Sequence, residues 1–247
     1  MKGILVRIGI DSTRGNWNAP VDPETRKFIY VPIPAYDQTP DDYEEIIFYL
    51  TEFCKNYGKD LYNDLRFPTA LENQYAHLDP DFEYLTYGDV GTRRGSGITT
   101  MDEGDLIAFY GGLKPIKPSQ HKLVYALIGL YIIDEINWAL DVPKERWHEN
   151  AHTRKQNISM TDIIVRAKPN LSGRLERCIP IGEYRNRAYR VRNDLLTAWG
   201  GLSVKNGYIQ RSIVPPSFLK PEQFYSWFKD QNISLLQVKN LSCFFKD

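Results

Sequence analysis

The feature that most constrains the fold is a pair of apolar runs in the middle of the chain. The first run covers residues 106–110, follows the turn formed by residues 102–105 and ends at Gly111 and Gly112. The second covers residues 121–136 and is rich in aliphatic and β-branched side chains. Apolar runs bounded by Gly and Asp predict buried strands. The centre of the chain should therefore be one strand followed by a long strand or a bent pair of strands.

Shorter patterns predict further elements on both sides of this unit. The expected strands are residues 3–10, 27–33, 83–86, 162–167 and 175–181. The expected helices are residues 41–57, 141–155 and 190–199, and one that begins at Pro221. Strands and helices do not alternate regularly, which argues against a doubly wound parallel sheet. We therefore expect an α+β protein, in which a mixed, partly closed β-sheet carries peripheral helices and residues 1–247 form a single domain.

Composition indicates a cytoplasmic globular protein. The chain has 247 residues, of which 42% are hydrophobic and 25% are charged, so it can bury a sizeable core. No apolar run approaches the 18 residues of a membrane span, and the first apolar run is too short for a signal peptide. Cys54, Cys178 and Cys243 lie far apart, which excludes a disulfide framework or a cysteine-based zinc site.

Charge is distributed unevenly although the net charge is zero. Residues 37–64 contain eight acids and two lysines, whereas residues 166–212 contain ten bases and three acids. A local basic region can bind a polyanion on a neutral molecule. Aromatic residues make up 13% of the chain, and Tyr184, Tyr189, Trp199 and Tyr208 are interleaved with these bases, as single-stranded or flipped-out nucleic acid requires. The open alternatives are that the rings pack in the core and that the arginines pair with the acidic helix.

Residues 148–152 match the H-E-x-x-H pattern of zinc peptidases and lie in an expected helix. There His148 and His152 would share one face, with Glu149 near a metal-bound water. The flanking residues are charged, however, and no third ligand is evident among four histidines. We therefore expect no bound metal and no cofactor, and hydrogen bonds from these side chains to loops or to a ligand. A zinc-dependent hydrolase through His148 and His152 is the weakest alternative.

The segment from Gly91 to Gly97 is rich in glycine and contains Arg93 and Arg94. Glycine lets backbone amides approach an anion, and guanidinium groups bind phosphate through two hydrogen bonds. A flexible surface loop is the open alternative. Asp11 and Asp89 lie in loops next to expected strands, where catalytic carboxylates and turn-capping side chains both occur. Because binding residues gather on loops of a rigid scaffold, we expect Asp11, Arg14, Tyr87, Asp89 and this segment on one side of the fold.

Several segments resemble the third family of nucleotide modification associated domains. They are residues 6–12, 28–34, 77–82, 86–89, 103–113, 150–152, 172–175, 180–182 and 199–212. The resemblance implies an association with base-modification systems but no particular reaction. If Asn150, Ala151 and His152 are what the family shares, Glu149 is incidental, which weakens the zinc interpretation.

A second resemblance concerns residues 104–110 and 123–132, which are similar to the strand pair of PUA-like modules, the group that includes EVE, YTH and ASCH domains. Such modules are barrels that bind RNA or hold a modified base between aromatic side chains. The resemblance places Tyr110 near the rim of a pocket, with Trp17, Tyr87 or Trp199 as stacking partners.

The leading hypothesis is a protein that binds nucleic acid or a modified nucleotide. The rival is an enzyme acting on a nucleotide or nucleobase as a transferase or hydrolase, so enzymatic activity is left open. Candidate acid–base groups are Asp11, Asp89, His148 and His152. Candidate nucleotide-binding residues are Arg14, Trp17, Tyr87, Arg93, Arg94, Tyr110, Arg174, Arg187, Arg190, Trp199, Lys205 and Arg211. Rings around an apolar slot would favour a binding protein, whereas carboxylates and histidines that converge would favour an enzyme.

Overall fold

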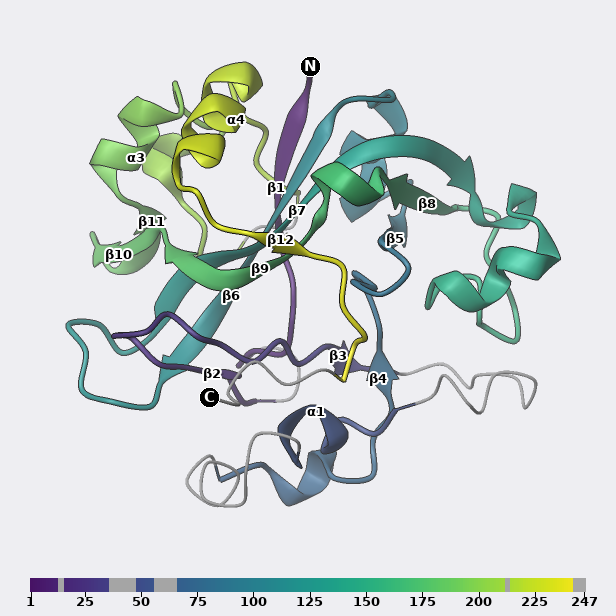
Figure 1. The fold of residues 1–247 in the computed structure, drawn as a ribbon, viewed down its shortest axis with the longest axis horizontal. Helices are drawn as coiled ribbons and strands as arrows, with labels where there is room; N and C mark the ends of the chain where they lie inside the picture. The colour runs from purple at the N-terminus through teal and green to yellow at the C-terminus, as the bar shows by residue number, and fades with distance from the viewer. Residues whose placement is uncertain (13–15, 36–47, 56–65, 212–213, 242–247) are drawn as a thin grey trace.

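The computed structural model describes residues 1–12, 16–35, 48–55, 66–211 and 214–241. Its main element is an eight-stranded mixed sheet (Figure 1). The strands of this sheet are β1 (Gly3–Arg7), β2 (Pro20–Val21), β5 (Thr86–Val90), β6 (Leu106–Pro115), β7 (Val124–Trp138), β8 (Asp162–Ala167), β9 (Gly173–Pro180) and β12 (Leu235–Leu236). Two small two-stranded sheets join β3 (Ile33–Pro34) to β4 (Ala76–His77) and β10 (Gly182–Arg185) to β11 (Ala188–Val191).

The long strand β7 organises the large sheet. It runs antiparallel to β6 along one edge. On its other edge, the first part of β7 pairs with β9 and the last part pairs with β8, which carries β5 beyond it. Strand β1 lies parallel to β6 on the far side. Nearly all side chains of β1 and β6 and of the first two thirds of β7 are buried, so these three strands form the centre of the hydrophobic core.

Helices lie around the sheet. The α-helices are α1 (Glu52–Lys55), α3 (Asn193–Ala198) and α4 (Pro221–Asp230). In Figure 1, α3 and α4 lie together near β10 and β11, at the end of the molecule away from β5 and β8. Short 3-10 turns are η2 (Thr69–Leu71), η3 (Arg94–Thr100), η4 (Ala139–Asp141), η5 (Lys144–Glu149), η6 (Pro169–Leu171) and η7 (Lys205–Gly207). Within the described ranges, none of these helices is long and apolar enough to cross a membrane.

The α+β class and the mixed sheet are confirmed. The central strand pair is confirmed as well, but Gly111 and Gly112 do not end the first strand. They continue β6, and the irregularity is a shift of register between Phe109 and Tyr110. The sheet is not closed into a barrel over the described residues, so the expected PUA-like barrel is not confirmed.

Expectations for the flanking strands hold in part. Residues 162–167 form β8 as expected, and 175–181 correspond to β9. The expected strand 27–33 is reduced to β3 and one bridge between Phe28 and Val21, since Pro32 and Pro34 donate no backbone hydrogen bond. Residues 83–85 form a turn before β5, because the carboxylate of Asp81 accepts hydrogen bonds from the backbone amides of Glu83 and Tyr84.

The expected helix over residues 141–155 is wrong. This segment forms η4, η5 and a following turn. Side chains compete with the helical hydrogen bonds there, since Oδ1 of Asn150 accepts from the amide of His152 at 2.8 Å and the hydroxyl of Thr153 donates to the carbonyl of Trp147 at 2.7 Å.

Two of the remaining helices are observed in full or in part. The helix from Pro221 is confirmed as α4. The helix expected over 190–199 begins only at Asn193, since residues up to Val191 belong to β11. Most of the helix expected over 41–57 lies outside the described residues, which include only α1.

Trp199 provides a test of the core beside α3. Its side chain is 0% exposed and packs edge-on against Phe218, Phe224 and Trp227, with ring centroids 5.2–5.8 Å apart. We expect Trp199→Ala to lower the free energy of unfolding by about 3–5 kcal/mol in urea titrations. The matched control Trp138→Ala removes a ring that is 41% exposed and should cost far less. Equal losses for the two variants would contradict this account of the core.

Candidate functional site

The candidate site lies beside β5, where two loops far apart in the sequence meet. One loop follows β4 and carries Asp79, and the other follows η5 and carries His152. Asn150 joins both loops to the strand. Its amide donates to the hydroxyl of Thr86 at 3.1 Å and lies 3.4 Å from Oδ1 of Asp79, while its Oδ1 holds the amide of His152. One asparagine side chain therefore fixes the relative position of the two loops.

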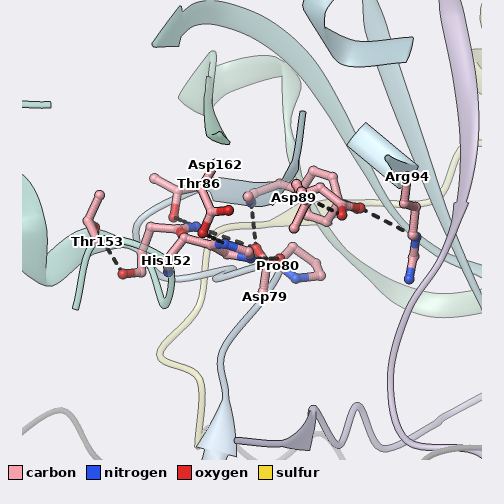
Figure 2. Close-up of polar contacts among 12 residues, drawn as sticks. Asp79, Pro80, Thr86, Asp89, Arg94, His152, Thr153 and Asp162 are labelled. Carbon is pink, nitrogen blue, oxygen red and sulfur yellow. Dashed lines mark hydrogen bonds and ion pairs between the residues drawn. The ribbon is translucent and has the colours of Figure 1, made fainter. Parts of the chain in front are cut away.

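His152 lies at the centre of the site and is 6% exposed. Its Nδ1 is hydrogen-bonded to Oδ2 of Asp162 at 2.6 Å, and Nζ of Lys155 donates to the same oxygen at 3.1 Å. Its Nε2 lies 3.5 Å from Oδ2 of Asp79. The second oxygen of Asp79, Oδ1, accepts a hydrogen bond from the amide of Gly88 at 2.7 Å. Figure 2 shows Asp79, His152 and Asp162 together with Thr86 of β5.

Burial and charge act in opposite directions on these groups. Burial alone lowers the pKa of His152, but its hydrogen bonds with Asp162 and Asp79 outweigh burial and raise the pKa to about 9. Burial raises the pKa of Asp79 above its ordinary value, and the contacts with His152 and Gly88 offset only part of this effect. Burial acts in the same direction on Asp162, but hydrogen bonds with His152 and Lys155 keep its pKa below the ordinary value. At neutral pH the centre is thus an imidazolium placed between two carboxyl groups.

The site continues along β5 toward Arg94. The hydroxyl of Tyr87 donates to Oδ2 of Asp89 at 2.7 Å, and Nε of Arg94 lies 3.4 Å from the same oxygen. Burial raises the pKa of the Tyr87 hydroxyl, and the charge of Asp89 raises it further. Figure 2 shows Arg94, Asp89, Asp79 and His152 in one row. The row places charged groups of both signs next to one another, with His152, Asp79 and Asp89 largely buried and Arg94 partly exposed.

Arg94 also connects this row with Asp11. Its guanidinium donates to the backbone carbonyl of Arg7, and the side chain of Arg7 forms an ion pair with Asp11 at 3.0 Å. The structure therefore brings Asp11, Tyr87, Asp89 and Arg94 to one side of the fold, as expected from their positions next to strands. Arg93 is exposed beside Arg94, and Arg14 lies outside the described residues.

Several rings expected to stack on a base do not have the exposure that this requires. Tyr110 and Trp199 are each 0% exposed, and Tyr87 is almost as deeply buried. The hydroxyl of Tyr110 donates to the carbonyl of Ile209 at 2.8 Å, so this ring lies in the core and not at a pocket rim. Trp17 is half-buried and packs edge-on against Phe67. Strand formation at residue 110 and packing on α4 at residue 199 account for these positions.

The basic residues after position 170 divide into buried and exposed groups. Arg174 is buried, with its guanidinium 5.1 Å from the ring of Phe28. Arg190 is half-buried over Tyr208, and its guanidinium donates to the carbonyl of Lys205. Arg187, Lys205 and Arg211 are exposed. Only part of the basic segment is therefore exposed and able to contribute to the expected surface, because Arg174 points into the core.

The H-E-x-x-H segment does not form a metal site. The ring of His148 packs edge-on against Tyr84, and Glu149 forms ion pairs with Arg146 and Arg166. The pattern requires an α-helix to bring both imidazoles to one face, whereas η5 ends at Glu149. The zinc-hydrolase alternative through this segment is therefore wrong.

The histidine that does lie near His152 is His77 of β4. The centroids of the two rings are 5.1 Å apart. His77, Asp79 and His152 each present one ligand atom, and these atoms lie within 4.8 Å of one another. No other group of three or more His, Cys, Asp or Glu in the described ranges is arranged to hold a metal ion.

Reasoning from sequence patterns missed His77, Asp79, Lys155 and Asp162. Asp79 and Asp162 lie far apart in the sequence, and nothing in their local surroundings marks them as partners of His152. The signal that was available is the resemblance of residues 77–82 and 150–152 to one family, since these are the two segments that the structure brings together.

The fold and the site define an α+β domain with a buried histidine–carboxylate centre beside a mixed sheet. The chain belongs to the family described as nucleotide modification associated domain 3, whose family model matches residues 2–211. No curated protein and no solved structure shows a significant match. The family relates the domain to nucleotide modification, and both loops of the site lie within the matched residues.

Gly88 provides a test of the site's geometry. A Cβ atom at this position would lie 2.6 Å from Cδ2 of His152 and 2.9 Å from Oδ1 of Asn150. We expect Gly88→Ala to displace the loop of His152 and to lower the free energy of unfolding by about 1–3 kcal/mol in urea titrations. In the control Gly97→Ala the nearest atom lies 4.0 Å away, so stability should change little. If both variants are as stable as the wild type, the close approach of this loop to β5 is wrong.

Proposed function

We propose that this domain is an enzyme that modifies a nucleotide or a nucleobase, with Asp79, His152 and Asp162 in its reaction centre. The observation that carries the proposal is the convergence of these three ionisable side chains in one largely buried position. Burying charged groups costs free energy, and replacing such groups by apolar ones is often neutral for stability or stabilising. Buried ionisable groups with shifted pKa values are therefore concentrated at functional sites.

The environment of the aromatic residues supports an enzyme over a binding protein. A pocket that reads a modified base needs rings with free faces, but Tyr87, Tyr110 and Trp199 are used in the core. The PUA-like resemblance of residues 104–110 and 123–132 had placed Tyr110 at a pocket rim, with Trp17, Tyr87 or Trp199 as stacking partners. Carboxylates and histidines converge instead, which is the arrangement expected of an enzyme.

Each side chain has a defined part in this proposal. Asp162 orients His152 through Nδ1, which directs Nε2 toward Oδ2 of Asp79. Gly88 fixes one oxygen of Asp79 and leaves the other beside His152. At the other end of the row, Arg93 is exposed and the side chain of Arg94 is 36% exposed. We assign these two arginines to the phosphate of the substrate, because guanidinium groups bind phosphate oxygens through paired hydrogen bonds.

The proposed activity can be tested with a panel of nucleosides, nucleotides and oligonucleotides, followed by mass spectrometry of the bases. If His152 and Asp79 take part in the reaction, His152→Gln and Asp79→Asn should lower turnover by about 10²–10⁴-fold. His148→Gln is the matched control, because His148 packs on Tyr84 and lies outside the centre. Unchanged turnover in His152→Gln would contradict the assignment. If the wild-type protein binds a nucleotide of the panel but does not convert it, a binding protein is favoured over an enzyme.

We further propose that Arg187, Lys205 and Arg211 form a contact surface for a nucleic-acid substrate, since all three are exposed and come from one basic segment. The apparent affinity for a single-stranded oligonucleotide should then fall linearly with salt on a log–log scale. The double variant Arg187→Ala/Arg211→Ala should flatten this slope by about 1 to 2.

The control for this experiment is Lys117→Ala/Lys168→Ala. It changes the net charge equally, but each lysine is already paired, with Glu24 and Glu103 respectively. Its slope should equal that of the wild type. Equal slopes for both double variants, or no binding at low salt, would leave a free nucleotide as the substrate.

A further inference from the structure

We propose that His77, Asp79 and His152 bind one divalent transition-metal ion of the Zn²⁺ or Fe²⁺ type. The assignment deepens the proposed function, on which the catalytic role of the ion rests. Binding of the ion itself rests only on the positions of the ligand atoms. It departs from the expectation of no bound metal, and of the H-E-x-x-H pattern it uses only His152, without His148 or Glu149.

The three side chains are the donor set that such ions use. Two imidazoles and one carboxylate occur in catalytic zinc sites and in mononuclear iron sites of oxygenases. Ligands at about 2.1 Å from a common tetrahedral ion are roughly 3.4 Å apart. Nε2 of His152 and Oδ2 of Asp79 already lie 3.5 Å apart. All three ligand atoms lie within 4.8 Å, so a rotation of the half-buried His77 would complete the set.

Neighbouring groups orient two of the ligands before any ion binds. Asp162 occupies Nδ1 of His152, so Nε2, which faces Oδ2 of Asp79, is the nitrogen directed at the proposed ion. A carboxylate bonded to the far nitrogen of a ligating histidine is the usual outer partner in metal sites. The amide of Gly88 likewise occupies Oδ1 of Asp79 and leaves Oδ2 directed at His152. The amide of Gly88 and the carboxylate of Asp162 therefore correspond to the outer hydrogen-bond partners that orient the ligands of a metal ion.

Charge at this position also suits a dication. The carboxyl groups of Asp79 and Asp162 both lie next to His152, and Lys155 is paired with Asp162. An ion bound through Nε2 of His152 takes the place of the proton there, and the two carboxylates and one lysine then leave a net negative charge around the ion. Three protein ligands would leave coordination positions open to water or to the substrate, which is characteristic of catalytic sites and not of structural ones.

The test is metal binding by the full-length chain without an affinity tag. Protein stripped with a chelator is titrated with Zn²⁺, and anaerobically with Fe²⁺, in a calorimeter, and bound metal is counted by elemental analysis. We expect about one ion per chain for the wild type. His77→Gln and His152→Gln should weaken binding by at least 100-fold, and Asp162→Asn by about 10–100-fold. Substitution with Co²⁺ should give the visible absorption bands of a coordinated ion, and His77→Gln should lose them.

His148→Gln and His121→Gln are the controls, because both residues lie outside the proposed ligand set. They should bind as the wild type does. No saturable binding by wild-type protein, or equal binding by His77→Gln and His148→Gln, would overturn the proposal. His77 is only half-buried, so His77→Gln tests the site even if His152→Gln fails to fold. A protein that binds one ion but converts no nucleotide would retain the metal site and refute the proposed function. Conversion of a nucleotide by protein without a bound ion would support the proposed function and refute the metal site.

Discussion

The structure depends on the backbone hydrogen bonds of one strand. β7 pairs with β6 along one edge and with β9 and β8 in succession along the other, so this single strand joins the two ends of the sheet. Each backbone group buried in the core must find a partner, and three neighbours supply these partners. The position of β8, and through it of β5, follows from this pairing. The loop of Asp79 leads into β5 and the loop of His152 leads into β8, so the geometry of both loops depends on β7 through these two strands.

The candidate site shows how polar groups are accommodated next to such a sheet. The loops around β5 contain many donors and acceptors that are hidden from water, and an unpaired buried polar group is costly. Asn150 satisfies several of them at once, and the amide of Gly88 satisfies Asp79. The same contacts direct His152 and Asp79 toward each other. The same hydrogen bonds therefore supply partners for the buried polar groups of the loops and hold His152 and Asp79 in position.

Local patterns were reliable where one physical effect dominated. The strands β6, β7 and β8 and the helix α4 could be predicted because apolar periodicity and a Pro at the helix start act over a few residues. The prediction failed over residues 141–155, because side chains of Asn150 and Thr153 took the backbone bonds that a helix would use. It also failed for Trp199, since an aromatic residue next to bases has the same local pattern whether it packs or stacks.

The amino-acid sequence by itself determined the α+β class, the central strand pair and the family, because these follow from side-chain periodicity and from residues 2–211 as a whole. It also indicated that Asp11, Asp89 and Arg94 lie near strand ends, and the structure joins them through Arg7. Only the tertiary structure decided which groups surround His152. Its partners Asp79 and His77 come from a distant loop and strand, and the distances between them depend on the pairing of β5 with β8, which no local pattern encodes.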